Sequence, residues 1–138
     1  MGRGRVIYFP WDVDRTFWEV LDVNHARLLK NAVLWATNEE APLEVSGAGV
    51  LDISIWTQKS SMAVHLVNLT NPMMMKGPIR EIIPSPPQHV KVRIPEGKKV
   101  SGVRLLVGGG NASVRTTNNV LELTIPSIGL HEVIAIDL

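Results

Sequence analysis

The chain has 138 residues, which is the length of one domain or of one domain with a fragment of another. Hydrophobic residues make up 45% of it and charged residues 20%, which excludes disorder as the main state. The net charge of +1 argues against a nucleic-acid partner, and the lack of cysteine excludes disulfides, thiol catalysis and thiolate metal sites. Residues 1–10 lack the apolar core of a signal peptide, and no apolar run reaches the about 20 residues that span a bilayer, so we expect a soluble protein without a membrane partner.

The first 41 residues are predicted to contain a strand, a loop and a helix. Residues 5–9 (RVIYF) form a short apolar run closed by a proline, as a buried strand would be. Residues 11–24 are interpreted as an aromatic and acidic loop. Apolar positions then recur at helical spacing over residues 25–37, with Asp22 or Asn24 as the predicted N-cap. A lone strand and one helix do not make a domain, so we interpret residues 1–41 as the remnant of a larger one.

After Pro42 the hydrophobic period changes from 3.6 to 2, which indicates strands. Glycine and asparagine punctuate the apolar runs, as tight hairpin turns require. The predicted fold is mainly β: an antiparallel β-sandwich of about eight strands over residues 42–138, preceded by the strand-loop-helix remnant. The predicted strands are 43–46, 50–57, 61–69, 89–94, 100–107, 111–116, 119–125 and 130–137.

The stretch over residues 61–87 links the two halves of this block. Its first part, 61–69, carries apolar residues on both faces, which predicts a central strand covered on both sides. The arm that follows is rich in proline and cannot be a helix or a central strand. Because it also holds Met73–Met75, Ile79, Ile82 and Ile83, we expect it to lie against the edge or face of the sandwich.

An aromatic cluster near the start of the chain is the most suggestive site pattern. Sugars stack on aromatic rings while charged groups hold their hydroxyls, so the cluster is a candidate carbohydrate surface. The favoured alternative is that its rings pack against the helix or against an absent domain, because large aromatics gain most by burial. Trp56 lies on the polar side of its strand and is a second candidate for an exposed ring, unless the arm covers it. The candidate residues are Trp11, Asp12, Asp14, Arg15, Trp18 and Trp56.

Other patterns favour structural interpretations over chemistry. Asp12 with Asp14, or Glu39 with Glu40, could be a glycosidase pair, but neighbouring loop carboxylates are more often turn formers and caps. The four histidines show no metal-ligand spacing. Gly108–Gly110 is followed by a strand pattern rather than by a helix, which favours a hairpin over a phosphate loop. We therefore predict no catalytic residue, no cofactor and no metal.

The order of motifs resembles the C-terminal end of bacterial glycoside hydrolases of the β-galactosidase type. The matching pattern is Tyr8-Phe9-Pro10, Asp12, Asp14-Arg15, Trp18, His25, Leu28-Leu29, Asn31-Ala32-Val33 and Trp35-Ala36, then residues 65–72 (HLVNLTNP) and 77–81 (GPIRE). The resemblance implies the closing strand and helix of a flavodoxin-like trimerisation domain, followed by the C-terminal β-domain. Family members carry their acid/base and nucleophile carboxylates on an N-terminal (β/α)8 barrel, for which this chain has no room.

Three functions follow as hypotheses. The leading one is a non-catalytic accessory module of a glycoside hydrolase-like protein, as a fragment or a truncated stand-alone form. The second is a carbohydrate-binding module that uses exposed aromatics, and the third is a small enzyme whose site lies between subunits. An unpaired strand at 5–9 would present an adhesive edge, so we also expect self-association or contact with missing upstream domains.

Overall fold

The computed structural model describes residues 4–20, 22–70, 78, 80–110 and 112–138. Two compact units make up the chain, Met1–Ala41 and Pro42–Leu138, and each is described by itself. The division after residue 41 lies within the polar segment Asn38–Pro42. None of the described helices is long and apolar enough to cross a membrane.

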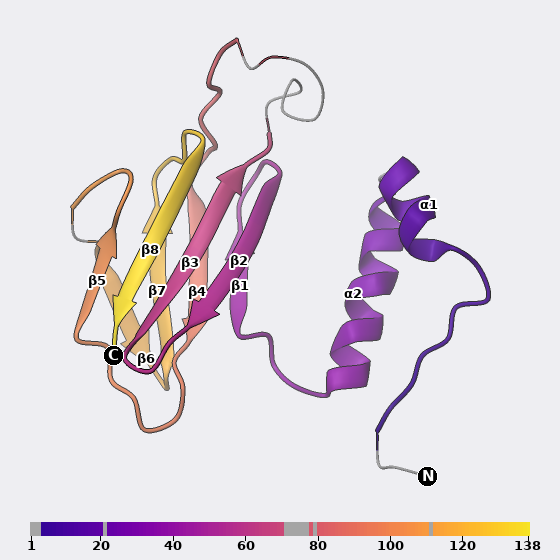
Figure 1. Ribbon diagram of the computed structural model, residues 1–138, viewed down its shortest axis with the longest axis horizontal. Coiled ribbons are helices and arrows are strands. Elements are labelled where there is room, and N and C mark those ends of the chain that lie inside the picture. Colours follow the sequence, from indigo (N-terminus) through magenta and orange to yellow (C-terminus); the bar gives the residue numbers. More distant parts are fainter. Residues whose placement is uncertain (1–3, 21, 71–77, 79, 111) are drawn as a thin grey trace. The chain divides into compact units, whose positions relative to one another are not determined.

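The first unit is helical (Figure 1). It contains α1 (Val13–Val20) and α2 (Val23–Thr37). The Asp22 carboxylate accepts a hydrogen bond from the backbone N–H of Asn24 at 2.6 Å and caps α2, as one of the two predicted N-caps would. Asn38 ends α2 in the left-handed conformation, with a φ of 54°.

Two predictions for this unit are wrong. The segment interpreted as a loop contains α1, whose first turn is closed by a hydrogen bond from the N–H of Thr16 to the carbonyl of Asp12 at 3.0 Å. Residues 5–9, predicted to be a strand, have no regular secondary structure, and most of them are exposed. The reason is that a strand needs a hydrogen-bonded neighbour, and every described strand that could pair with it belongs to the other unit. The adhesive edge expected at 5–9 is therefore not formed.

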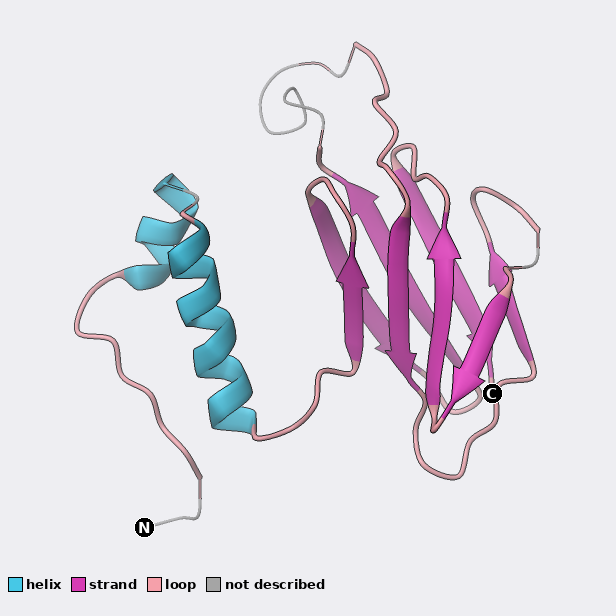
Figure 2. Ribbon diagram, turned by 180° about the vertical axis from the view of Figure 1, so that it is seen from behind, coloured by secondary structure: helices cyan, strands magenta, loops and turns pink. Residues whose placement is uncertain are grey.

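The second unit is the predicted β-sandwich. Figure 2 shows its eight strands in two layers, and each sheet is antiparallel throughout. One sheet has the order β1-β4-β7-β6 and the other the order β2-β3-β8-β5. The ends of the predicted strands move by at most three residues. The strands are β1 (Leu43–Ser46), β2 (Leu51–Thr57), β3 (Ser61–Asn68), β4 (Gln88–Arg93), β5 (Gly102–Leu105), β6 (Val114–Thr117), β7 (Val120–Ile125) and β8 (His131–Asp137).

The hydrophobic core lies between the two sheets. Alternate residues of each central strand point inward, so that Val64 and Leu66 of one sheet face a core shared with Val90 and Val92 of the other. β3 is central in its sheet, as predicted. Its second face, however, is only half-buried, because the described residues of the second unit form two sheets and the core lies between them.

Of two hairpin turns predicted from asparagine and glycine residues, the structure contains one. Asn118 and Asn119, with φ of 49° and 62°, form the predicted hairpin turn between β6 and β7. The hairpin predicted at Gly108–Gly110 is wrong, since β5 and β6 lie in different sheets and this segment crosses between them. The buried carboxylate of Glu132 holds the crossing by accepting hydrogen bonds from the backbone N–H groups of Val107 at 3.0 Å and Gly108 at 2.8 Å.

The proline-rich arm also crosses between the sheets, because β3 and β4 belong to different ones. Its end is tied to the β7–β8 loop, where the N–H of Ser85 donates to the carbonyl of Ile128 at 2.8 Å. Ile82 and Ile83 remain about half exposed rather than buried. Met73–Met75 and Ile79 lie outside the described residues.

Candidate functional site

The six predicted site residues fall into two groups. Trp11, Asp12, Asp14, Arg15 and Trp18 lie together at α1 and the residues that lead into it. Trp56 lies on β2 in the other unit. Five of the six therefore lie in the first unit, and the sixth lies in the second.

The carboxylates at α1 are solvent-exposed and interact with each other. A hydrogen bond with the Asp14 side chain, together with its charge, raises the pKa of Asp12, whereas the backbone N–H of Arg15 lowers the pKa of Asp14. Asp12 is thus the member of the pair that takes up a proton first as the pH falls. Arg15 is engaged elsewhere, in an exposed ion pair with Glu19 at 2.8 Å. These are the properties of a charged helix start, because a general acid gains its raised pKa from burial that Asp12 does not have.

The aromatic rings near α1 are only partly packed. Trp11 meets Phe9 edge to face, with ring centroids 5.6 Å apart, but it is 51% exposed. Trp18 is 64% exposed. Trp35, on the helix against which the favoured hypothesis packs these rings, lies under the guanidinium of Arg5, which is 5.3 Å from its ring centroid.

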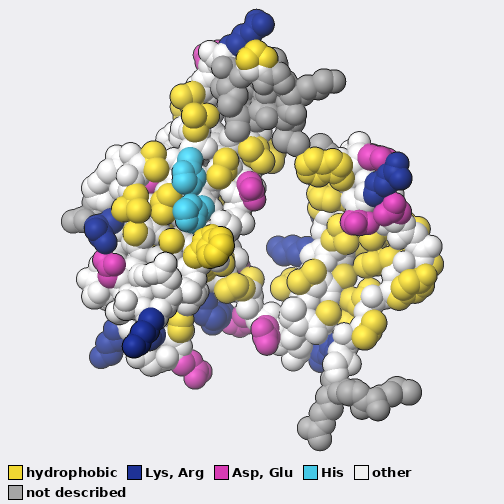
Figure 3. All heavy atoms as spheres, in the orientation of Figure 1, with side chains coloured by type: hydrophobic (Ala, Val, Ile, Leu, Met, Phe, Trp, Pro, Cys, Tyr) yellow, Lys and Arg dark blue, Asp and Glu magenta, His cyan; other side chains and the backbone are white. Residues whose placement is uncertain are grey.

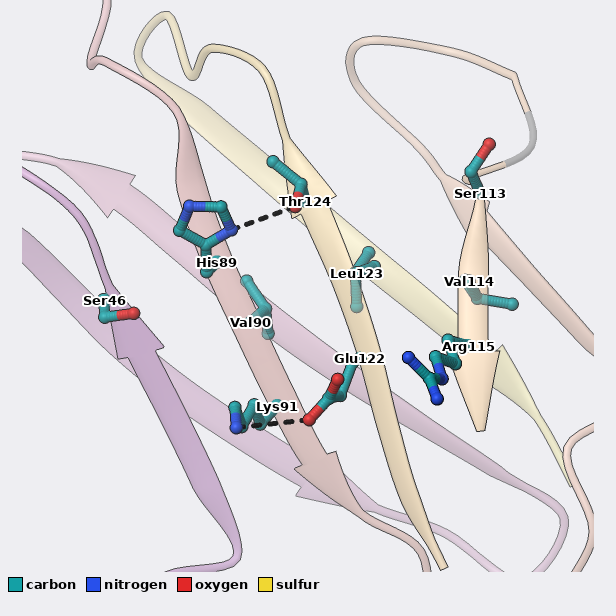
Figure 4. A pocket seen from close by; sticks show the side chains of 10 residues that line it. All are labelled: Ser46, His89, Val90, Lys91, Ser113, Val114, Arg115, Glu122, Leu123 and Thr124. Carbon is teal, nitrogen blue, oxygen red and sulfur yellow. Dashed lines mark hydrogen bonds and ion pairs between the residues drawn. The ribbon is translucent and has the colours of Figure 1, made fainter. Parts of the chain in front are cut away.

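A shallow polar depression of about 740 Å³ lies on the outer face of the β1-β4-β7-β6 sheet (Figure 4). Cross-strand pairing places Glu44, Lys91, Glu122 and Arg115 in one row of alternating charge. Lys91 and Glu122 form an ion pair at 3.1 Å. Glu122 is the only carboxylate among the described residues that line the depression, so the pair of carboxylates that glycoside hydrolysis uses does not occur there.

The outer face of the β2-β3-β8-β5 sheet carries an exposed tryptophan and two histidines that contact each other. Register places Trp56 opposite Ala63, and His65 lies two residues further along β3 on the same face. His131, on β8, contacts His65. Figure 3 shows the two histidine side chains on this face with hydrophobic side chains around them. We call this surface the Trp56–histidine face; it comprises Trp56, Ala63, His65, His131 and Ala135.

The two imidazoles are joined end to end. Nδ1 of His65 and Nε2 of His131 are 3.3 Å apart, and the ring planes differ by 13°. The ring centroids are 5.4 Å apart. This distance is close to the nitrogen–nitrogen separation plus the distance from each nitrogen to the centre of its own ring. The two nitrogens therefore lie on the line between the ring centres, so the contact is an in-plane N–H···N hydrogen bond rather than a face-to-face stack.

The histidine pair could not be found from the sequence. His65 and His131 are 66 positions apart, and they meet only because β3 pairs with β8 in one particular register. The available signal was the alternation along residues 61–68, which puts His65 on the face opposite the core. Trp56 was predicted to lie on the polar side of its strand, and it is 64% exposed.

Comparison with solved structures finds a distant likeness to a glycoside hydrolase. The fold matches part of alpha-L-fucosidase isoenzyme 2 from Paenibacillus thiaminolyticus with a TM-score of 0.74 and 15% identity, over 92% of this chain and 20% of that one. The chain therefore spans about a fifth of that enzyme's length. The sandwich is less than three quarters of the chain, so the matched part extends into the helical unit. At this identity the likeness shows the fold alone.

No family model matches the sequence, and no curated protein sequence matches it. The resemblance to glycoside hydrolases is thus supported at the level of a distantly related fold. The narrower resemblance to the C-terminal region of β-galactosidase-type enzymes is not shown by the comparison.

Proposed function

We propose that this chain is a non-catalytic accessory module of a glycoside hydrolase-like protein. The observation that carries the proposal is the fold match, which takes in nearly the whole of this chain but only a fifth of the fucosidase chain. A part of that size corresponds to a module beside a larger enzyme body. The β-galactosidase-type motif order supports placing it at the C-terminal end of such a protein.

The chemistry of the described carboxylates supports the non-catalytic role. Asp12 and Asp14 are exposed to solvent, and Glu122 is paired with Lys91. Glu132 is buried, and backbone N–H groups occupy both of its oxygens. A glycosidase needs one carboxyl group with a raised pKa and a second one facing it across a substrate cleft, and none of these groups has that setting.

The exposed apolar side chains of the helical unit also support the proposal. None of the described residues of α2 is buried, and α1 buries only Val13. Trp18, Val33 and Trp35 are more than half exposed. Apolar surface of this extent on two short helices is typical of an element whose core is completed from outside the unit.

The non-catalytic role is tested by assaying the purified chain on aryl fucosides and aryl galactosides. We expect no turnover above the buffer blank, for the wild-type chain and for a variant carrying both Asp12→Asn and Asp14→Asn. Turnover by the wild type that the double variant loses would overturn the proposal in favour of an enzyme. Equal turnover by both would show that Asp12 and Asp14 are not its source. Activity that then stays with the chain through a further purification step would also overturn the proposal, and activity that separates from the chain would identify a contaminating hydrolase.

The accessory role is tested in the cells from which the sequence derives. An antibody raised against residues 42–138 should detect a polypeptide with a mass well above 15.2 kDa. Peptide sequencing of that band should recover peptides from a catalytic barrel domain. A single band at 15.2 kDa would instead show a stand-alone protein. The accessory role within a longer chain would then be wrong.

A further inference from the structure

We propose that the Trp56–histidine face binds a neutral saccharide. This goes beyond the accessory role, because a module can support an enzyme body without binding any ligand. The proposal rests on three features of this face: the polarity of the histidine pair, the small residues beside Trp56, and the charge at its border.

The histidine pair offers matched hydrogen-bonding groups to solvent. A neutral imidazole has one N–H donor and one acceptor nitrogen, and the internal bond consumes a donor from one ring and an acceptor from the other. Whichever ring donates, the two outward nitrogens, Nε2 of His65 and Nδ1 of His131, are left as one donor and one acceptor. Two neighbouring hydroxyls of a sugar can satisfy both at once, because each hydroxyl both donates and accepts.

These outward nitrogens are available. Among the described side chains, the only buried nitrogen or oxygen without a partner is Nδ1 of His25. Within the described residues, the outward nitrogens of His65 and His131 have no protein partner, and both histidines are half-buried rather than buried. The hydrogen bond between the two imidazoles already restricts their side-chain rotation. A ligand that binds them therefore loses less free energy to side-chain ordering.

Two small residues separate Trp56 from a polar border. Cross-strand register puts Trp56, Ala63, Ala135 and Arg104 in one row across four strands. The two alanines carry only a methyl group each, between an exposed indole at one end of the row and a guanidinium at the other. Four strands at about 4.8 Å spacing span roughly 14 Å between the outer members of the row, which accommodates a pyranose ring.

The charge at the border favours a neutral ligand. Nη2 of Arg104 is 3.2 Å from Oδ2 of Asp137, so cation and anion offset each other. An ion-paired guanidinium and carboxylate still offer donors and acceptors to hydroxyls. A metal ion fits less well, because a zinc site needs three or more protein ligands, and no group of three or more His, Asp or Glu side chains among the described residues could hold one.

The test is an NMR titration of the full chain with the methyl glycosides of galactose, fucose, glucose, mannose and xylose. We expect at least one of them to shift backbone resonances of residues 54–65 and 131–135 together. Trp56→Ala should weaken that binding at least tenfold, and His131→Phe, which keeps a planar ring but removes both nitrogens, should do the same. Trp18→Ala is the matched control, with an equally exposed tryptophan in the other unit, and it should bind like the wild type.

Folding checks and several outcomes of the titration can contradict saccharide binding at this face. Each variant is first checked for an unchanged thermal midpoint and an unchanged spectrum away from the site, and Trp56→Phe replaces Trp56→Ala if the latter is not folded. No shift with any of the five glycosides, or shifts that map to α1, would overturn the proposal. Shifts of His65 and His131 with zinc but with no glycoside would overturn it in favour of a metal site. None of these outcomes affects the hydrolysis and immunoblot tests, which do not use this face.

Discussion

Asn68 connects three segments of the sandwich through a single buried side chain. Its Nδ2 donates to the carbonyls of Ile83, Ile128 and Gly129 at 2.8, 3.1 and 2.8 Å, and its Oδ1 accepts from the N–H of Thr70 at 3.0 Å. The amide therefore holds the end of the arm and the β7–β8 loop against β3. Asn68 also begins an Asn-Leu-Thr glycosylation triplet, but its nitrogen is buried and occupied in the folded chain.

Replacing this amide should destabilise the fold. Asn68→Ala removes a hydrogen bond from each of three carbonyls and from one N–H in a site that is 3% exposed, although the Ile128 carbonyl keeps the Ser85 N–H. We therefore expect a loss on the order of 3 kcal/mol in the free energy of unfolding. Urea unfolding followed by circular dichroism measures it. Ser46→Ala, at an exposed position on β1, is the control and should change stability by less than about 0.5 kcal/mol. Equal stability of the two variants would show that the Asn68 hydrogen bonds are dispensable.

At the scale of elements, the β6–β7 hairpin depends on two residues with positive φ. Asn118 and Asn119 form a two-residue loop whose backbone twist suits antiparallel strands, and the pairing of Thr117 with Val120 closes it. Asparagine tolerates this conformation better than most residues, while β-branched side chains clash with the backbone there. The turn is therefore fixed by local chemistry and not by the core.

A substitution at Asn119 tests this dependence. We expect Asn119→Val to destabilise the sandwich by about 1–2 kcal/mol, because a left-handed conformation is costly for a β-branched residue. Asn119→Gly should leave stability within about 0.5 kcal/mol of the wild type, since glycine adopts this conformation freely. The urea midpoints of the two variants give the comparison. A valine variant as stable as the glycine variant would mean that the turn adopts another geometry in solution.

Local sequence patterns predicted the strands but not every connection between them. Alternating apolar residues predicted all eight strands because the period of a strand is a property of its own residues. The same reasoning read the glycines at 108–110 as a hairpin, whereas the chain crosses to the other sheet at that point. The choice between turning back and crossing depends on Glu132, a buried carboxylate far along the chain that binds the backbone of Val107 and Gly108.

At the scale of the whole molecule, the core belongs to the second unit alone. Every member of the buried hydrophobic cluster lies between Leu43 and Leu138. Among the described residues of the helical unit, the one buried hydrophobic side chain is that of Val13, which is not part of this cluster. The two units should therefore differ in their ability to fold independently.

Expressing the units separately tests this difference. We expect residues 42–138 to unfold cooperatively and to keep the amide spectrum of the sandwich in the full chain, because the strands and the core are complete within that segment. A peptide of residues 1–41 should show little helix in water, since short helices without a buried face are marginal. A sandwich segment that is unfolded by itself, or a strongly helical peptide, would contradict this division.

The sequence by itself determined the fold class, the strand positions and the N-cap of α2, because each depends on residues close together in the chain. Tertiary structure decided the rest. It left residues 5–9 without a strand, since a strand forms only with a partner, and it made α1 from a segment rich in aromatic residues. It also brought His65 and His131 together beside Trp56, because cross-strand register is set by the packing of the whole core and not by any local pattern.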